Sequence, residues 1–170
     1  MFTVRRLGPS DAASFVALRL QGLQEAPTAF GASFEEECDR PVSAVAERIA
    51  NNTEGFILGA FEGGALVGVV GMQRERPRKR AHKMVLWGMY VTPPARGKGF
   101  GRKLVDEALR LGFTMSGVRQ VILGVNAANA PALALYRAAG FTAFGVERAC
   151  MIVDGIPQDE VHMVRVRHEG

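Results

Sequence analysis

A cluster of glycines and cations at residues 96–103 is the part of the sequence whose composition most directly suggests a chemical role. The segment reads Arg-Gly-Lys-Gly-Phe-Gly-Arg-Lys and separates an apolar, strand-like run from a stretch with helical periodicity. Glycine lets the backbone turn sharply and approach a ligand closely, because it has no Cβ. The start of the following helix adds unpaired N–H groups and the positive end of the helix dipole. These features predict a site that binds phosphate groups. A simple reversal of the chain would need only one glycine and none of the four cations.

Two common nucleotide-binding loops do not match this segment. A Walker A loop has the form G-x-x-x-x-G-K followed by Ser or Thr, and the sequence contains no such match. The dinucleotide fingerprint G-x-G-x-x-G also fails. Counted from Gly97 and Gly99, the third glycine is replaced by Arg102, and counted from Gly99 and Gly101 it is replaced by Leu104. The predicted phosphate ligand therefore belongs to another class.

Three motifs occur in order between residues 84 and 141. The strand-like run reads Y-V-x-P from Tyr90 to Pro93, the loop reads R-x-x-G-x-G from Arg96 to Gly101, and residues 129–141 follow N-x-x-A-x-x-L-Y-x-x-x-G-F. In this combination the sequence resembles the GCN5-related N-acetyltransferase (GNAT) superfamily. The resemblance implies an acetyl-CoA-dependent N-acetyltransferase that transfers an acetyl group directly to an amine of a small molecule or peptide.

The resemblance also implies how acetyl-CoA would be held. Backbone groups of the strand before the loop would pair with the pantetheine arm, and amides of the loop would bind the pyrophosphate. The side chain of Asn129 would hydrogen-bond the cosubstrate, although an Asn two residues before Pro131 is also a plain helix N-cap. The implied cofactor-binding residues are Met89, Tyr90, Val91, Arg96, Gly97, Lys98, Gly99, Phe100, Gly101, Arg102 and Asn129.

Tyr136 is the candidate catalytic residue. Acetyl transfer releases a CoA thiolate, and a phenol can hydrogen-bond to that sulfur and protonate it. The resemblance places Tyr136 in this role, because it is the tyrosine of the third motif. The alternative is a helix tyrosine that packs on the sheet.

The sequence departs from the superfamily pattern at the general base. Many relatives carry a Glu on the strand before the cofactor loop, but here no Asp or Glu occurs between Glu75 and Asp106, and Val85 stands near that position. This departure leaves open a second hypothesis, a CoA-binding module without catalysis.

Several other groups could take the proton of the amine, which is mostly charged at neutral pH. His82 and His162 have side chains of a suitable type, although His82 belongs to a charged loop. The acidic run Glu35–Glu37 could attract a cationic acceptor or form an exposed helix face. Deprotonation by bulk water or a water chain is a further route.

The positive charge of the chain is local. The 170 residues carry a net charge of +4 and a pI near 9.5, yet residues 74–83 alone hold +5 and residues 96–103 hold +4. The segment 74–83 is typical of a solvated loop, and it lacks the interleaved aromatic residues that favour nucleic-acid binding. We therefore expect no nucleic-acid partner, and binding through residues 74–83 is a third, weaker hypothesis.

The remaining composition indicates the class of protein and its cellular compartment. Hydrophobic residues make up 48% and charged residues 22% of the chain, which is typical of a globular protein and excludes disorder. Cys38 and Cys150 are too few for a disulfide framework or a cysteine zinc site, so we expect a cytoplasmic protein without metal. The most apolar stretch, 55–72, is interrupted at 62–64, and the amino terminus has no apolar run, so we expect no membrane segment or signal peptide. A homodimer is left open.

The elements that must position these residues form one domain over residues 1–170. The pattern predicts an α/β fold like that of GNAT proteins, with a mixed, mostly antiparallel sheet, flanking helices and a C-terminal β-hairpin around Asp154-Gly155. The run 84–91 is expected to be a central strand, because it is apolar on both faces. Strands are predicted at 2–7, 55–61, 65–73, 84–91, 120–125, 143–153 and 160–166, and helices from 10 or 11 to Pro27, at 41–51, 104–113 and 131–139.

Overall fold

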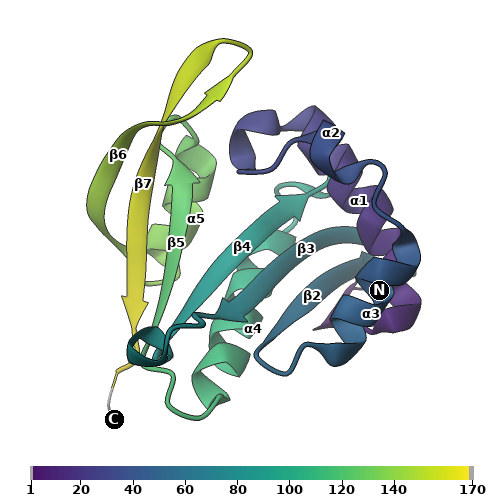
Figure 1. Cartoon of the computed structure of the whole chain (residues 1–170), viewed down its shortest axis with the longest axis horizontal. Coiled ribbons are helices and arrows are strands. Elements are labelled where there is room, and N and C mark those ends of the chain that lie inside the picture. Colours follow the sequence, from purple (N-terminus) through teal and green to yellow (C-terminus); the bar gives the residue numbers. More distant parts are fainter. Residues whose placement is uncertain (1, 169–170) are drawn as a thin grey trace.

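A seven-stranded sheet crosses the whole molecule (Figure 1). In the computed structural model, which describes residues 2–168, the strand order is β1-β2-β3-β4-β5-β7-β6. Only β4 and β5 pair in parallel, and the other neighbours are antiparallel. The strands are β1 (Phe2–Arg6), β2 (Gly55–Glu62), β3 (Ala65–Arg74), β4 (Lys83–Val91), β5 (Gln120–Asn126), β6 (Thr142–Val153) and β7 (Ile156–Val166).

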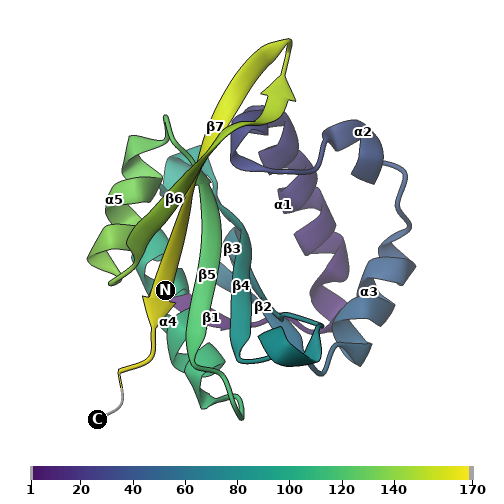
Figure 2. The same cartoon turned by 60° about the vertical axis from the view of Figure 1, so that its left-hand side comes forward.

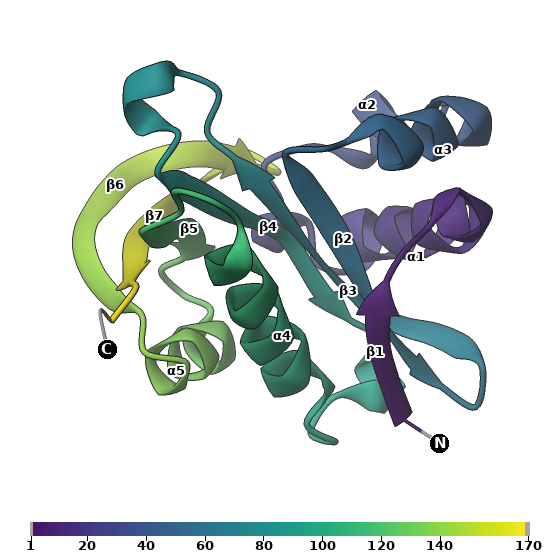
Figure 3. The same ribbon diagram turned by 90° about the horizontal axis from the view of Figure 1, so that it is seen from below.

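Helices cover both faces of this sheet, as Figure 3 shows. The helices α1, α2 and α3 lie on one face, and α4 and α5 lie on the other. Their bounds are α1 (Ala12–Glu25), α2 (Phe34–Glu37), α3 (Val42–Asn51), α4 (Phe100–Thr114) and α5 (Ala130–Ala138). No helix in the described part of the chain is both long enough and apolar enough to cross a membrane.

Two apolar cores result, one on each face. Met84 and Leu86 of β4 point into the core beneath α4 and α5, where both are buried. Trp87 and Tyr90 of the same strand pack into the core beneath α1–α3. The strand β4 is therefore covered on both sides and lies between β3 and β5, which confirms the prediction of a central strand.

The C-terminal hairpin forms as the Asp154-Gly155 signal predicts. Both residues have positive φ, 50° and 77°, and the turn brings Val153 opposite Ile156. Figure 2 shows the tip of this β6–β7 hairpin extending beyond the rest of the sheet. The strand β7 begins at Ile156 rather than at residue 160, because the pairing with β6 runs up to the turn despite two register shifts.

Two helices differ from the sequence prediction. The helix α4 begins at Phe100 rather than at Leu104, since its first turn contains a glycine and two cations that give no apolar periodicity. The short helix α2 lies in a segment to which the pattern assigns no element. It is fixed by a capping box, in which the Ser33 hydroxyl accepts a bond from the Glu36 amide and the Glu36 carboxylate accepts one from the Ser33 amide.

Candidate active site

A wedge-shaped gap opens between the parallel strands β4 and β5. The two strands pair only at their beginnings, where residues 83–85 lie opposite 120–122. Beyond that point each strand continues with its other neighbour, β4 with β3 and β5 with β7, and the two move apart (Figure 1). Within residues 2–168, the edges of β4 and β5 that face the gap therefore have no strand partner. Such edges can bind an extended ligand through backbone hydrogen bonds.

A β-bulge shapes the β4 side of the gap. Gly88 and Met89 together stand opposite one residue of β3, and Gly88 has a φ of +63°. The extra residue reverses the alternation of side chains along the strand. As a result Met89 and Val91 pack toward α4, whereas Tyr90 packs toward α1. These are the three residues that the sequence predicts to line the pantetheine arm, and they lie at the gap.

The glycine loop leads from the end of β4 into α4. Gly97 and Gly99 have φ values of 77° and 89°, which side chains other than glycine rarely adopt. A Cβ at either position would have no neighbour within 4 Å, so the space above the loop is open. Gly99 is the N-cap of α4 and offers no side-chain acceptor to the first amides of the helix. Those amides, from Phe100 onward, are therefore available to an anion.

Three of the four cations in residues 96–103 bind carboxylates of the protein, and the fourth, Lys103, lies over the Phe2 ring. Arg96 donates to Glu25 at the end of α1, with distances of 3.2 and 2.7 Å, and to the carbonyl of Val91 at 2.9 Å. Lys98 lies 3.0 Å from Glu62. Arg102 likewise pairs with Asp106 one turn along α4. The phosphate-binding capacity of the loop therefore rests mainly on its backbone, and Arg96 ties the loop to α1.

Asn129 is the N-cap of α5. Its side-chain oxygen accepts a hydrogen bond of 3.2 Å from the Ala132 amide, as expected for a helix N-cap. The side-chain nitrogen is not used by this cap.

Tyr136 lies on α5 beneath the sheet and is 5% exposed. Its ring packs edge-on against Phe141 with 5.8 Å between centroids. Burial raises the pKa of the Tyr136 phenol far above its ordinary value, so the phenol is neutral at any physiological pH. Its hydroxyl forms no side-chain hydrogen bond with another residue of 2–168, which leaves it available as a proton donor.

The opposite face of the gap carries a histidine between two glutamates. His162 of β7 lies 3.1 Å from the Glu147 carboxylate and 3.9 Å from that of Glu160. Glu160 folds directly over Gly124 of β5, where a Cβ would clash with it. Gly124 stands opposite His162 in the sheet and belongs to the part of β5 that has left β4. Glu160 therefore lies at the β5 edge of the gap, and His162 lies one strand behind it, between Glu160 and Glu147 of β6.

Glu160 is the residue of this group that sequence patterns do not reveal. The only signal is the Asp154-Gly155 turn, but regular counting from the Val153–Ile156 pair brings Ala149 opposite Glu160, and Glu147 takes that place only through a register shift. Neither glutamate belongs to a motif, and two register shifts in β6 make such counting unsafe. The buried Asn126 next to this group is also absent from the predicted set. It bonds Gln158 at 2.9 Å and thus links β5 to β7.

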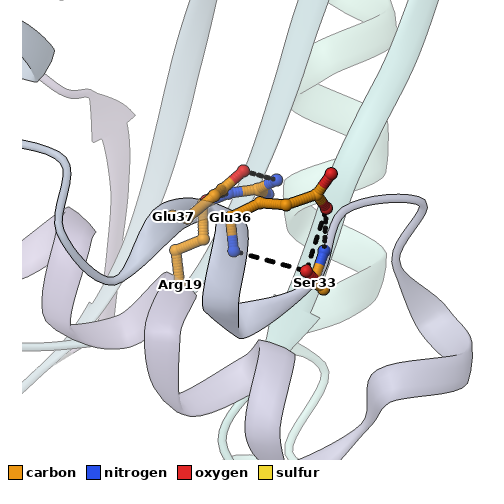
Figure 4. Close-up of polar contacts among 4 residues, drawn as sticks. All are labelled: Arg19, Ser33, Glu36 and Glu37. Atoms are coloured by element: carbon orange, nitrogen blue, oxygen red, sulfur yellow. Dashed lines mark hydrogen bonds and ion pairs between the residues drawn. The ribbon is translucent and has the colours of Figure 1, made fainter.

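The other proposed proton acceptors lie elsewhere. His82 precedes β4, and its carbonyl accepts the Arg119 amide at the end of β4 that is remote from the glycine loop. Figure 4 shows that Glu36 is bound in the Ser33 cap and that Glu37 accepts two bonds from Arg19, at 2.6 and 2.9 Å. The Arg19 guanidinium holds the pKa of Glu37 below its ordinary value, so this carboxylate is a poor base.

Comparisons with known proteins agree with this geometry. Residues 21–141 match the model of the "Acetyltransferase (GNAT) family". The chain is 36% identical over 115 residues to the N-alpha-acetyltransferase RimI of Mycobacterium tuberculosis, which covers 68% of this chain and 69% of that protein.

Two solved structures share the fold. The first, a GNAT-family acetyltransferase from Streptococcus pneumoniae, has a TM-score of 0.86 at 21% identity and covers 98% of this chain and 100% of its own. The second, a phosphinothricin acetyltransferase of Sinorhizobium meliloti in complex with AcCoA, has a TM-score of 0.83 at 25% identity, covering 99% and 90%. The chain therefore belongs to the GNAT family and is an N-acetyltransferase.

Proposed function

We propose that this enzyme transfers the acetyl group of acetyl-CoA directly to an amine of a small molecule or peptide. The observation that carries the proposal is the β4–β5 gap, which opens beside the free amides at the start of α4. An extended, anionic cosubstrate fits both features at once, because the unpaired strand edge suits an amide-containing arm and the helix start suits a diphosphate. The relative from Sinorhizobium meliloti, with the same fold, binds AcCoA.

Three segments of the chain would hold acetyl-CoA. Backbone groups of Met89, Tyr90 and Val91 would pair with the pantetheine arm along the bulged edge of β4. The backbone from Gly97 to Arg102 would bind the diphosphate, with the side chains of Arg96 and Lys98 near it. Asn129 would contribute its free side-chain nitrogen. The thioester supplies an activated acyl carbon, and the remaining steps depend on the protein.

Tyr136 would act as the acid of the reaction. When the amine nitrogen bonds to the acyl carbon and the C–S bond breaks, the departing sulfur carries a negative charge. A neutral phenol on the α4–α5 face can donate its proton there. Burial raises the pKa of Tyr136, so the phenol holds its proton until the thiolate forms and would first donate a hydrogen bond to the charged sulfur.

His162 would accept the proton that the amine loses. It lies on the α1–α3 face of the gap, opposite to Tyr136, so the acid and the base would approach the reacting carbon from different sides. Glu147 and Glu160 beside it would attract a protonated amine toward the imidazole. A strand carboxylate in β4, which this chain lacks, is then not required.

The test combines binding and turnover. Calorimetry at about 150 mM salt should show acetyl-CoA binding, and a panel of amines should reveal acetyl transfer by release of free thiol. Absence of binding would contradict the proposal at its first step. Binding without transfer to any amine would instead indicate the non-catalytic CoA-binding module.

We also propose a cytoplasmic protein that uses no metal and binds no nucleic acid. The cysteines Cys38 and Cys150 are free thiols, as a reducing compartment favours. In the basic segment 74–83, Arg80 is paired with Glu75 at 2.6 Å and Arg74 donates to backbone carbonyls, so part of its charge is used internally. Weak, salt-insensitive binding of DNA and RNA would support this expectation. The oligomeric state is open, and light scattering would decide whether a homodimer forms.

A further inference from the structure

A large open cavity lies on the α1–α3 face of the sheet, next to the candidate active site. Its volume is about 860 Å³, and its floor contains Ile57 of β2 and Val85 and Trp87 of β4. Its walls come from the ends of β1 and β3 and from α1 and α3. The charged residues that line it are Arg6, Arg19, Glu37, Arg48, Arg74, Glu75 and Arg76.

The carboxylates of the cavity are already neutralised. Glu37 is bound by Arg19, and Glu75 is bound by Arg80 at 2.6 Å, outside the cavity. Arg74 is held by Glu54 and by two backbone carbonyls.

Two arginines are left over on this face, namely Arg48 and Arg76, which form no ion pair within residues 2–168. The cavity is therefore a site with surplus positive charge.

One of the lining guanidinium groups is held in place by an aromatic ring. Arg19 lies 5.6 Å from the centre of the Trp87 ring. Partial burial and the nearby Arg40 and Arg19 lower the pKa of Arg48. An anion in the cavity would relieve this crowding of like charges.

The cavity reaches the reaction centre through β4. Arg19, on its wall, lies against Gly88 of the bulge. Val85 on its floor pairs with β5, and β5 pairs with β7 at His162. Val85 lies opposite Ile122 of β5, which lies opposite Val164 of β7. His162 is therefore two strand spacings across and two residues along β7, about 12 Å from the floor on the same face of the sheet. A single acceptor can span this distance.

We propose that the cavity binds an acidic group of the acceptor, so that the substrate is an amine with a carboxylate about 12 Å from its nitrogen. This inference rests on the proposed function. An extended peptide advances about 3.3 Å per residue, so the third residue lies about 7 Å from the N-terminal nitrogen, and a Glu side chain at that position covers the remaining distance. A polyamine has the wrong charge for the cavity, because its second ammonium group would face unpaired arginines.

The test compares amidated tetrapeptides that differ only at the third position. Ala-Ala-Glu-Ala-amide should have a kcat/KM about tenfold above that of the Gln peptide, and the Lys peptide and spermidine should be poorer still. In the double variant Arg48→Gln/Arg76→Gln, the preference for Glu over Gln should disappear through KM, with kcat unchanged. Turnover of the Gln peptide by this variant shows that it is folded. Arg110→Gln, which removes a paired arginine from the exposed side of α4, should keep the preference.

The outcomes separate the two proposals. Equal use of the Glu, Gln and Lys peptides, preference for spermidine, or an unchanged preference in the double variant would overturn the acidic-acceptor proposal and leave acetyl transfer intact. A wild-type enzyme that acetylates none of these amines nor any other would overturn both.

Discussion

The two faces of the sheet at the β4–β5 gap are built in different ways. On the α4–α5 face, the proposed site consists of backbone amides and one buried phenol, and its parts lie within the contiguous stretch 89–136. On the α1–α3 face, the proposed site consists of charged side chains drawn from segments that are far apart, such as Arg48 of α3 and His162 of β7. A face that binds one fixed ligand can be encoded locally in backbone conformation. A face that selects a substrate is assembled by tertiary structure, and we expect mutations on the two faces to have different signatures.

The largest effect is expected at the buried acid. Tyr136→Phe should lower kcat about 1,000-fold, because water cannot easily reach this position to protonate the sulfur. The affinity for acetyl-CoA, measured by calorimetry, should stay within about twofold, since the ring and its contact with Phe141 remain. Unchanged turnover would remove Tyr136 from the reaction.

A smaller effect is expected at the exposed base. His162→Gln should lower kcat/KM about 100-fold at neutral pH, less than at Tyr136, because the His162 side chain is 34% exposed and water can take its place. Activity should recover toward about pH 9, where more of the amine is uncharged. A matched histidine variant, His82→Gln, should keep the wild-type pH profile. If both variants behave alike, His162 is not the proton acceptor.

The backbone conformation of the glycine loop should affect binding rather than chemistry. Gly99→Ala forces a side chain into a φ of +89° and should weaken acetyl-CoA binding about fivefold, because the amides of the α4 start would be reoriented. Gly117→Ala is the matched control, since Gly117 has a similar φ of +77° with open space around it. Calorimetry and thermal unfolding of both variants would separate a loss of acetyl-CoA affinity from a loss of stability. Equal affinity with equal loss of stability would mean that the loop does not bind the cosubstrate.

The smallest effect is expected at Arg96, which links the glycine loop to the end of α1. Arg96→Gln breaks the pair with Glu25 and should lower the Tm by about 1–2 °C, a small value because the pair is partly exposed. Arg96 holds the pKa of Glu25 below its usual value of 4.5, so the folded state favours the ionised carboxylate. The stabilisation is therefore present above pH 4.5 and is lost as the pH falls below it. Thermal unfolding of wild type and variant between about pH 3 and pH 7 would detect this, and a Tm difference that grows on acidification would contradict it.

The sequence predicts one face of the site far better than the other. The gap-lining strand, the glycine loop and Tyr136 follow from local motifs. The structure places the strand and the loop at one gap, and it buries Tyr136 on α5 in the core of the same face. Glu160 and the arginine cavity could not be predicted, because they depend on sheet register and on how α1 and α3 pack. The start of α4 at Phe100 could not be predicted either, since Gly101 and its charged neighbours give no periodic apolar signal. The carboxylate pairing of Arg96 likewise depends on a contact with Glu25, 71 positions away.

The narrow parallel seam between β4 and β5 has a consequence for how the molecule opens. Among residues 2–168, only the pairing of 83–85 with 120–122 joins the strand ladder of β1–β4 to that of β5–β7. Backbone amides on the two sides of the seam are therefore expected to exchange with solvent as two separate cooperative units, joined mainly through packing under α4. A cosubstrate that binds in the gap between β4 and β5 would join these two cooperative units into one. The change in hydrogen-exchange protection on ligand addition would then spread across the whole sheet rather than stay at the contact residues.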